Sequence, residues 1–144
     1  MRLEIGKSKS GDALHYSVGA IIKQQGKFLL IDRAAVPPSG FAVLAGHVND
    51  NEAPAVTVAR TVTEESGLKA SNCRLVYEGE VSANWCTRGI CAHYWYVYEC
   101  EVGGGEPILS LLHAKSIGWD TVPEMKKLKF DPAVEYLFKK IKIL

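Results

Sequence analysis

The chain has 144 residues, of which 47% are hydrophobic and 23% are charged, and its formal net charge is +1. This length and composition predict a single globular domain over residues 1–144, with a core large enough to fold without disulfides or structural metals. The near-neutral charge gives no electrostatic reason to expect a nucleic-acid polymer or a membrane surface as partner, while a local pocket for one small anion stays open.

The N-terminal part of the chain predicts a β-hairpin that follows an irregular start. The first dozen residues are expected to be a frayed lead-in or an edge strand. Apolar, β-branched runs then predict strands, and Gly and Pro mark the turn and the loop between them. In chain order, we expect strands at His15–Ile22 and Lys27–Asp32 joined by a turn at Gln24–Gly26, a loop at Ala34–Gly40, and a short strand at Phe41–Leu44.

Ala53–Ser66 is the clearest predicted helix. Pro54 suits the first turn, where a missing N–H does no harm. Gly67 suits the left-handed position just past the helix end. Apolar and small residues recur at helical spacing and predict one buried stripe. The residues of that stripe are Val56, Ala59, Val62 and Thr63.

The C-terminal half alternates predicted strands with loops and closes on a helix. Asp131 is expected to cap this helix, with Pro132 at its first position. Strands before, between and after two helices predict an α/β fold in which a mixed sheet carries helices on both faces. The expected elements are strands at Leu75–Ser82, His93–Val102 and Ser116–Trp119, a loop at Gly103–Gly105, and a helix at Ala133–Ile141.

The first predicted helix carries Arg60, Glu64 and Glu65 near its end. Arg60 and Glu64 share one face of the helix, and Thr61 and Glu65 share the neighbouring face. Adjacent carboxylates repel one another and sit unfavourably at a helix C-terminus, and a cation beside them removes both penalties. Carboxylate oxygens suit Mg²⁺ or Mn²⁺, which keep several waters and bind substrate phosphates. A solvated acidic helix end is the alternative, and these residues alone would favour it.

The wider segment from Gly46 to Leu68 resembles the Nudix box. All specified positions of that motif but one are matched, at the family's spacing. The early hairpin, the strand before the box and a late Trp119 followed by a helix also follow the family's usual order. The matching residues are Gly46, Glu52, Arg60, Val62, Glu64, Glu65, Gly67 and Leu68.

This resemblance implies an α/β/α sandwich with a mixed central sheet, and hydrolysis of a nucleoside diphosphate linked to another moiety. The cofactor it implies is Mg²⁺ or Mn²⁺, and the partner is a small-molecule nucleotide. By position, Glu64 and Glu65 would be metal ligands, and Gly46 could offer a carbonyl to the metal. Arg60 would hold the box together by pairing with carboxylates, including Glu52.

Thr61 departs from the box, because the family has Glu at this place. A threonine hydroxyl is neutral and binds Mg²⁺ weakly compared with a carboxylate. The chain would then work with a carboxylate from elsewhere, work slowly, or act as a nucleotide-binding or regulatory module. The carboxylates considered as replacements are Glu78, Glu80, Glu99 and Glu106.

Further polar and aromatic residues are candidates for substrate binding. His47 would touch phosphate or be a solvated loop residue. Arg33 would reach a phosphate, although a solvated strand-end charge is the favoured interpretation. Trp85 would stack on a base or cover the edge of the core. A zinc site at Cys86, Cys91 and His93 is disfavoured, because paired metal-ligand spacing and a fourth ligand are lacking.

Neither a signal peptide nor a membrane-spanning apolar run is recognisable in the sequence, so we expect a cytoplasmic protein with reduced thiols. The C-terminal lysines are expected to form solvated faces and not a nucleic-acid site. A homodimer stays open as the quaternary structure, because C₂ dimers are the commonest oligomers.

Overall fold

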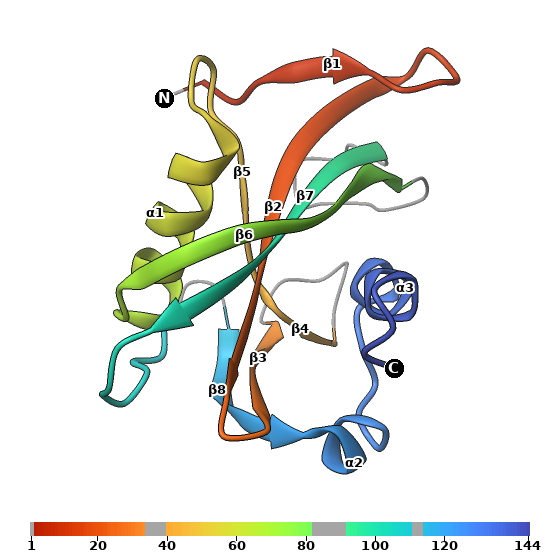
Figure 1. Cartoon of the computed structure of the whole chain (residues 1–144). Helices are drawn as coiled ribbons and strands as arrows, with labels where there is room; N and C mark the ends of the chain where they lie inside the picture. Colours follow the sequence, from red (N-terminus) through yellow and green to blue (C-terminus); the bar gives the residue numbers. More distant parts are fainter. Residues whose placement is uncertain (1, 34–39, 82–91, 111–113) are drawn as a thin grey trace.

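The structure is a computed structural model that describes residues 2–33, 40–81, 92–110 and 114–144. Five strands precede the first helix, three strands follow it, and two helices close the described part of the chain (Figure 1). The strands are β1 (Ile5–Lys7), β2 (Ala13–Gln24), β3 (Lys27–Arg33), β4 (Phe41–Ala42), β5 (Leu44–His47), β6 (Ala70–Val81), β7 (Ala92–Val102) and β8 (Ala114–Thr121), and the helices are α1 (Pro54–Ser66), α2 (Val122–Met125) and α3 (Pro132–Lys140).

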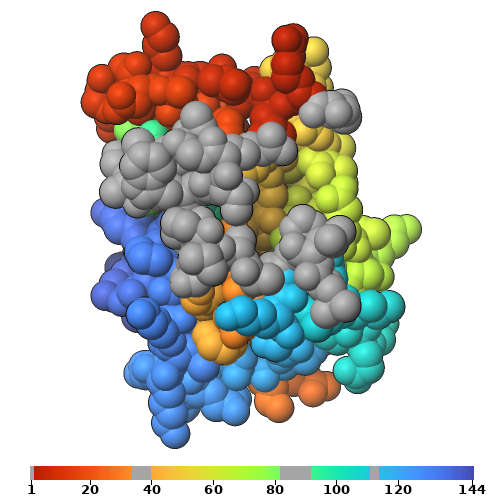
Figure 2. All heavy atoms as spheres, turned by 180° about the vertical axis from the view of Figure 1, so that it is seen from behind, coloured from red at the N-terminus to blue at the C-terminus, as the bar shows by residue number. Residues whose placement is uncertain are grey.

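The long strand β2 organises the sheet. It pairs in parallel with β7 along one edge, and it pairs antiparallel with β1, β5 and β3 in turn along the other edge. β6 extends the sheet beyond β7, and β4 and β8 both pair with β3. The sheet is therefore mixed, with α1 on one side and α3 on the other, which Figure 2 shows from behind as the yellow-green and blue surfaces. The predicted α/β/α sandwich with a mixed central sheet is confirmed.

The turn between β2 and β3 follows from its residues. Gln25 and Gly26 both have positive φ, 52° and 78°, which is the backbone of a two-residue turn matched to the twist of a hairpin. β2 and β3 pair only beside this turn, at Lys23↔Phe28 and Gln24↔Lys27. Along its whole length β3 pairs with β8 on its other side, so the hairpin joins two parts of the sheet.

The structure divides the predicted strand Phe41–Leu44 into two. β4 pairs with β3, whereas β5 pairs with β2, and the buried Val43 between them is where the chain crosses from one part of the sheet to the other. The strand predicted at Leu75–Ser82 is too short, because β6 already begins at Ala70. The sequence prediction also misses α2, which Thr121 and Glu124 open with a reciprocal capping box.

The buried face of α1 differs from the predicted stripe. Val56 is 58% exposed, and Ala59 and Thr63 are also exposed, so only Val62 of that stripe is buried. The helix instead turns inward the residues Thr57, Val58, Thr61, Val62, Glu65 and Ser66. The apolar pattern in this helix is weak, and packing against β5 and β2 selects a face that carries a carboxylate.

Both ends of α1 agree with prediction. Pro54 opens the helix, and Gly67 ends it in the left-handed conformation at φ 72°, with its N–H donating to the carbonyl of Thr63. Asp131 caps α3 by accepting from the N–H of Ala133 at 2.8 Å. No helix within the described ranges has the length and apolar character to cross a bilayer.

Candidate functional site

The site begins where β5 ends and the chain turns into α1. Gly46 lies on β5 directly against Thr61 of α1. A Cβ added at Gly46 would lie 2.6 Å from the Thr61 hydroxyl oxygen, so only glycine permits this approach. The close contact places the second half of α1 on the strand and brings Thr61 and Glu65, one turn apart, onto the face that β5 covers.

Arg60 is the centre of a hydrogen-bond network that joins the loop between β5 and α1 to α1 itself. Its Nε and Nη2 donate to the two carboxylate oxygens of Glu52 at 3.0 and 2.8 Å. Its Nη1 donates to Glu64 at 3.1 Å, and Nη2 also donates to the carbonyl of His47 at 3.2 Å. One guanidinium therefore joins β5, the loop and α1, and the pairing with Glu52 expected from the sequence is present.

Glu52 is held as an anion from several sides. Besides Arg60, the Thr57 hydroxyl donates to it at 2.8 Å and the Asn49 N–H at 3.2 Å. Its side chain is only 10% exposed. The hydrogen bond from Arg60 is the main cause that lowers the pKa of Glu52 from 4.5 to about 2, against the opposing effect of burial. The same bond raises the pKa of Arg60, so both partners are charged at neutral pH.

The low pKa of Glu52 predicts a contribution to acid unfolding. Because the carboxyl binds its proton more weakly in the folded chain than in the unfolded chain, its stabilisation is complete above pH 4.5 and is lost as pH falls toward 2. Urea unfolding between these pH values should show a steep loss of stability in the wild type. A Glu52→Gln variant should start less stable and show a flatter profile, whereas an equally steep profile would exclude this carboxyl as the cause.

The two adjacent carboxylates of the box lie in different surroundings. Glu64 is bound by Arg60, and its side chain is 54% exposed. Glu65 is 8% exposed and accepts from the Ala45 N–H of β5 at 3.3 Å. Both can offer oxygens to a cation, Glu64 from the solvent side and Glu65 from beside the strand. Mg²⁺ retains waters and takes substrate oxygens, so it needs no complete protein cage here.

Thr61 fills the place where the box motif has a carboxylate. It is 2% exposed, and its hydroxyl oxygen has no hydrogen-bond partner among the described residues. The hydroxyl is neutral and lies in the contact with Gly46. It supplies no charge to the site.

The carboxylates considered as replacements lie on other elements. Glu78 accepts from the Tyr94 hydroxyl at 2.8 Å, and Glu80 accepts from the Lys9 N–H at 3.0 Å. Glu99 pairs with Arg74 at 3.2 Å, and Glu106 is exposed after β7. Glu78 and Glu80 thus lie on β6, Glu99 on β7 and Glu106 after it, whereas Glu64 and Glu65 lie on α1.

Of the proposed substrate-binding residues, Arg33 and His47 lie on different strands. Arg33, at the end of β3, pairs with the buried Asp131 at 3.4 Å and so links this strand to the start of α3. It is therefore a paired strand-end charge and not a solvated one. The carbonyl of His47 accepts a hydrogen bond from Arg60, while the His47 ring contacts two other histidines. Trp85 lies outside the described residues.

A histidine cluster was missed in the sequence. His15, His47 and His93 bring their ligand nitrogens within 4.8 Å of one another. His93 was grouped in the sequence with Cys86 and Cys91, both outside the described residues. No local signal identifies this cluster, because its members come from β2, β5 and β7 and meet only through strand pairing.

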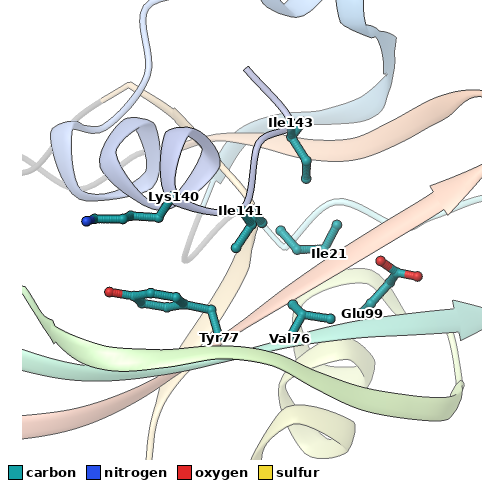
Figure 3. A pocket seen from close by; sticks show the side chains of 7 residues that line it. All are labelled: Ile21, Val76, Tyr77, Glu99, Lys140, Ile141 and Ile143. Atoms are coloured by element: carbon teal, nitrogen blue, oxygen red, sulfur yellow. The ribbon is translucent and has the colours of Figure 1, made fainter.

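The sheet face under α3 also holds a cavity of about 240 Å³. Figure 3 shows Tyr77 and Lys140 at one end of it, Glu99 at the other, and isoleucines of β2 and the C-terminal segment between them. Its lining is Ile21, Val76, Tyr77, Glu99, Lys140, Ile141 and Ile143, so no box residue contributes to it.

Comparisons with known proteins found a family model and solved structures that match this fold. The NUDIX domain model matches residues 13–140. A MutT NUDIX hydrolase from Burkholderia pseudomallei is 22% identical, with 88% of this chain and 96% of that chain covered and a TM-score of 0.75. A MutT protein from Methanosarcina mazei Go1 is 20% identical, covering 90% and 93%, with a TM-score of 0.71.

The NUDIX domain of Shewanella oneidensis NrtR, solved in complex with ADP ribose, is 14% identical, covering 95% and 92%, with a TM-score of 0.74. At these identities the solved structures show a shared fold. No curated protein matches the chain.

Proposed function

Because the chain belongs to the NUDIX family, we propose that it is a metal-dependent hydrolase that cleaves the phosphoanhydride bond of a nucleoside diphosphate linked to another moiety. The observation that carries this proposal is the network around Arg60, which joins the loop to α1 and binds Glu64, while Glu65 on the same helix accepts from the Ala45 N–H of β5. The whole chain would act as one domain on a small-molecule nucleotide, in the cytoplasm, without a nucleic-acid polymer or a membrane.

Some residues of the box would bind the metal, and others would position the metal ligands. Glu65, with Glu64 and the carbonyl of Gly46, would hold Mg²⁺ or Mn²⁺, since hard oxygen ligands suit these ions. When bound, the metal neutralises the diphosphate and lowers the pKa of a bound water. Arg60 and Glu52 would act as positioning residues, because the guanidinium is fully engaged in holding the loop, the helix and the His47 carbonyl. Arg33, His47 and Trp85 stay as candidates for substrate contacts.

A nucleotide-binding or regulatory module on the same fold is the second candidate. The observation that favours it is Thr61, a buried neutral residue where the box motif supplies an anionic ligand. Among the structural neighbours, the NUDIX domain of NrtR was solved with ADP ribose bound. A chain with a weakened metal site could bind such a compound without hydrolysing it.

A substrate panel separates the two candidates. The pure protein would be incubated with Mg²⁺ or Mn²⁺ and with ADP ribose, nucleoside triphosphates, dinucleoside polyphosphates and nucleotide sugars. Metal-dependent release of a nucleoside monophosphate from any of these supports the hydrolase. Tight binding of a nucleotide without turnover of any compound supports the module instead.

Thr61→Glu tests the missing ligand directly. The new carboxylate would lie one turn before Glu65 on the β5 face, so we expect the metal concentration for half-maximal activity to fall about tenfold, equivalent to about 1.4 kcal/mol. Stability without metal should fall, because a charge is placed where Thr61 is 2% exposed. Thr61→Val, which keeps the shape and adds no charge, is the control. Unchanged or weaker metal activation in Thr61→Glu would mean that another group already fills this place.

A further inference from the structure

Strand pairing brings three histidines to one face of the sheet. The parallel pairing of β2 with β7 sets His15 beside His93, and the antiparallel pairing of β2 with β5 sets His47 beside Ser17. His15 and Ser17 are two residues apart on β2, so their side chains share a face. The neighbouring Gly46 faces Thr61 of α1, and His47 therefore points to the opposite face of the sheet.

The three rings form one compact group. Their centroids are 4.9 Å apart for His15 and His47, 5.7 Å for His15 and His93, and 5.5 Å for His47 and His93. His47 and His93 meet diagonally across β2, because His93 lies beside His15 and His47 lies beside Ser17, two residues further along the same face of β2. His15 is 4% and His93 2% exposed, while His47 is partly exposed. The group thus has two buried members and one that borders the surface.

We propose that His15, His47 and His93 bind a divalent transition metal ion, with Zn²⁺ as the best match. Imidazole nitrogens suit Zn²⁺, Co²⁺, Ni²⁺ and Cu²⁺, whereas Mg²⁺ takes oxygen ligands. Nitrogens around a tetrahedral Zn²⁺ at about 2.0–2.1 Å lie about 3.3 Å from one another. The ligand nitrogens here lie within 4.8 Å, so modest side-chain rotations complete the geometry. Three protein ligands leave the fourth position to water or a small anion.

This site is distinct from the carboxylates of the box but is joined to them through the backbone. His47 contributes its ring to the cluster, while its carbonyl accepts from Arg60 at 3.2 Å. The ring faces away from α1, and Glu65 lies on the α1 side of β5. An ion on the histidines would therefore hold the end of β5 without using Glu64 or Glu65. The inference does not depend on the hydrolase proposal, because it is tested by metal binding and not by turnover.

Cobalt provides the direct test. Untagged protein, stripped with a chelator, would be titrated with Co²⁺, whose visible absorption is strong in a tetrahedral site and weak in water. We expect the band to saturate at an equimolar amount of Co²⁺, to disappear on addition of Zn²⁺, and to persist in a large excess of Mg²⁺. Zn²⁺ should also raise the thermal unfolding midpoint, since an ion that binds only the folded chain stabilises it.

Matched variants locate the ion. His93→Asn and His47→Ala should each weaken Co²⁺ binding about 100-fold or more. Each removes a metal ligand, and loss of a residue that only supports a ligand already lowers metal affinity about tenfold or more. His47 is the safer substitution because it is partly exposed, and circular dichroism of the metal-free variants checks their fold. His113→Asn removes the chain's fourth histidine, which lies outside the described residues, and should keep the band. Glu65→Gln should keep it as well.

Two kinds of result would contradict a metal site at the three histidines. Absence of the band in the wild type, or its persistence in both His47→Ala and His93→Asn, would overturn the site. Loss of the band in Glu65→Gln would move the ion to the box and would also overturn it. A wild type that turns over no nucleotide while retaining the band would contradict only the proposed hydrolase.

Discussion

Glu65→Gln is expected to lower kcat/KM for the best substrate of the panel by about 100-fold or more, equivalent to at least about 2.7 kcal/mol of transition-state stabilisation. The glutamine keeps the size of the side chain and an oxygen that can still accept from the Ala45 N–H, which lies 3.3 Å from the carboxylate. The variant therefore removes the charge with little disturbance of the contact between α1 and β5. Steady-state kinetics across a range of Mg²⁺ and Mn²⁺ concentrations measures the effect.

The metal dependence identifies the cause of the loss. If Glu65 is a metal ligand, higher Mn²⁺ should restore part of the activity, and the metal concentration for half-maximal rate should rise. Glu135→Gln, on the surface of α3, is the matched control and should behave as the wild type. A Glu65→Gln enzyme with unchanged kcat/KM would exclude this carboxylate from the reaction and would favour a different acidic residue.

Arg60→Met is expected to lower the free energy of unfolding by about 3 kcal/mol at neutral pH, because it leaves a largely buried carboxylate without its partner. Glu52 is 10% exposed at its side chain, and both of its oxygens accept from Arg60. Methionine retains much of the apolar stem of Arg60, so the loss reports mainly on the guanidinium. Urea unfolding followed by circular dichroism measures the change.

Two comparisons make this result specific. The double variant Arg60→Met with Glu52→Gln leaves no unpaired charge at position 52, so part of the stability should return. The double-mutant cycle gives the coupling between the two residues. Lys139→Met breaks an exposed pair with Glu135 on α3 and should cost less than about 0.5 kcal/mol. If Arg60→Met cost no more than Lys139→Met, the network would not be what holds the box together.

Local chemistry made several parts of the fold predictable. The turn expected at Gln24–Gly26 is present, with positive φ at Gln25 and Gly26. Pro54 and Gly67 mark the ends of α1 for reasons that lie within a few residues. Asp131 caps α3 in the same local way. The pair of Arg60 with Glu52 was expected from the box motif, and the structure contains it.

The buried face of α1 and the partner of Arg33 depended on tertiary packing. The sequence placed Val56 in the core, but packing against β5 turned a different face of α1 inward, with Thr61 and Glu65. Arg33 was expected to be a solvated strand-end charge, but the fold brought Asp131 to it from the other end of the chain. Such contacts join residues far apart in sequence, and no propensity or spacing within one segment determines them.

By itself the sequence determined most of the strands, both ends of α1, the cap of α3 and the residues of the box, because these follow from backbone preferences and short-range spacing. The register between β2, β5 and β7 was decided only in the tertiary structure, and with it the meeting of His15, His47 and His93. The physical reason is that a shift of one residue in strand pairing moves a side chain to the opposite face of the sheet.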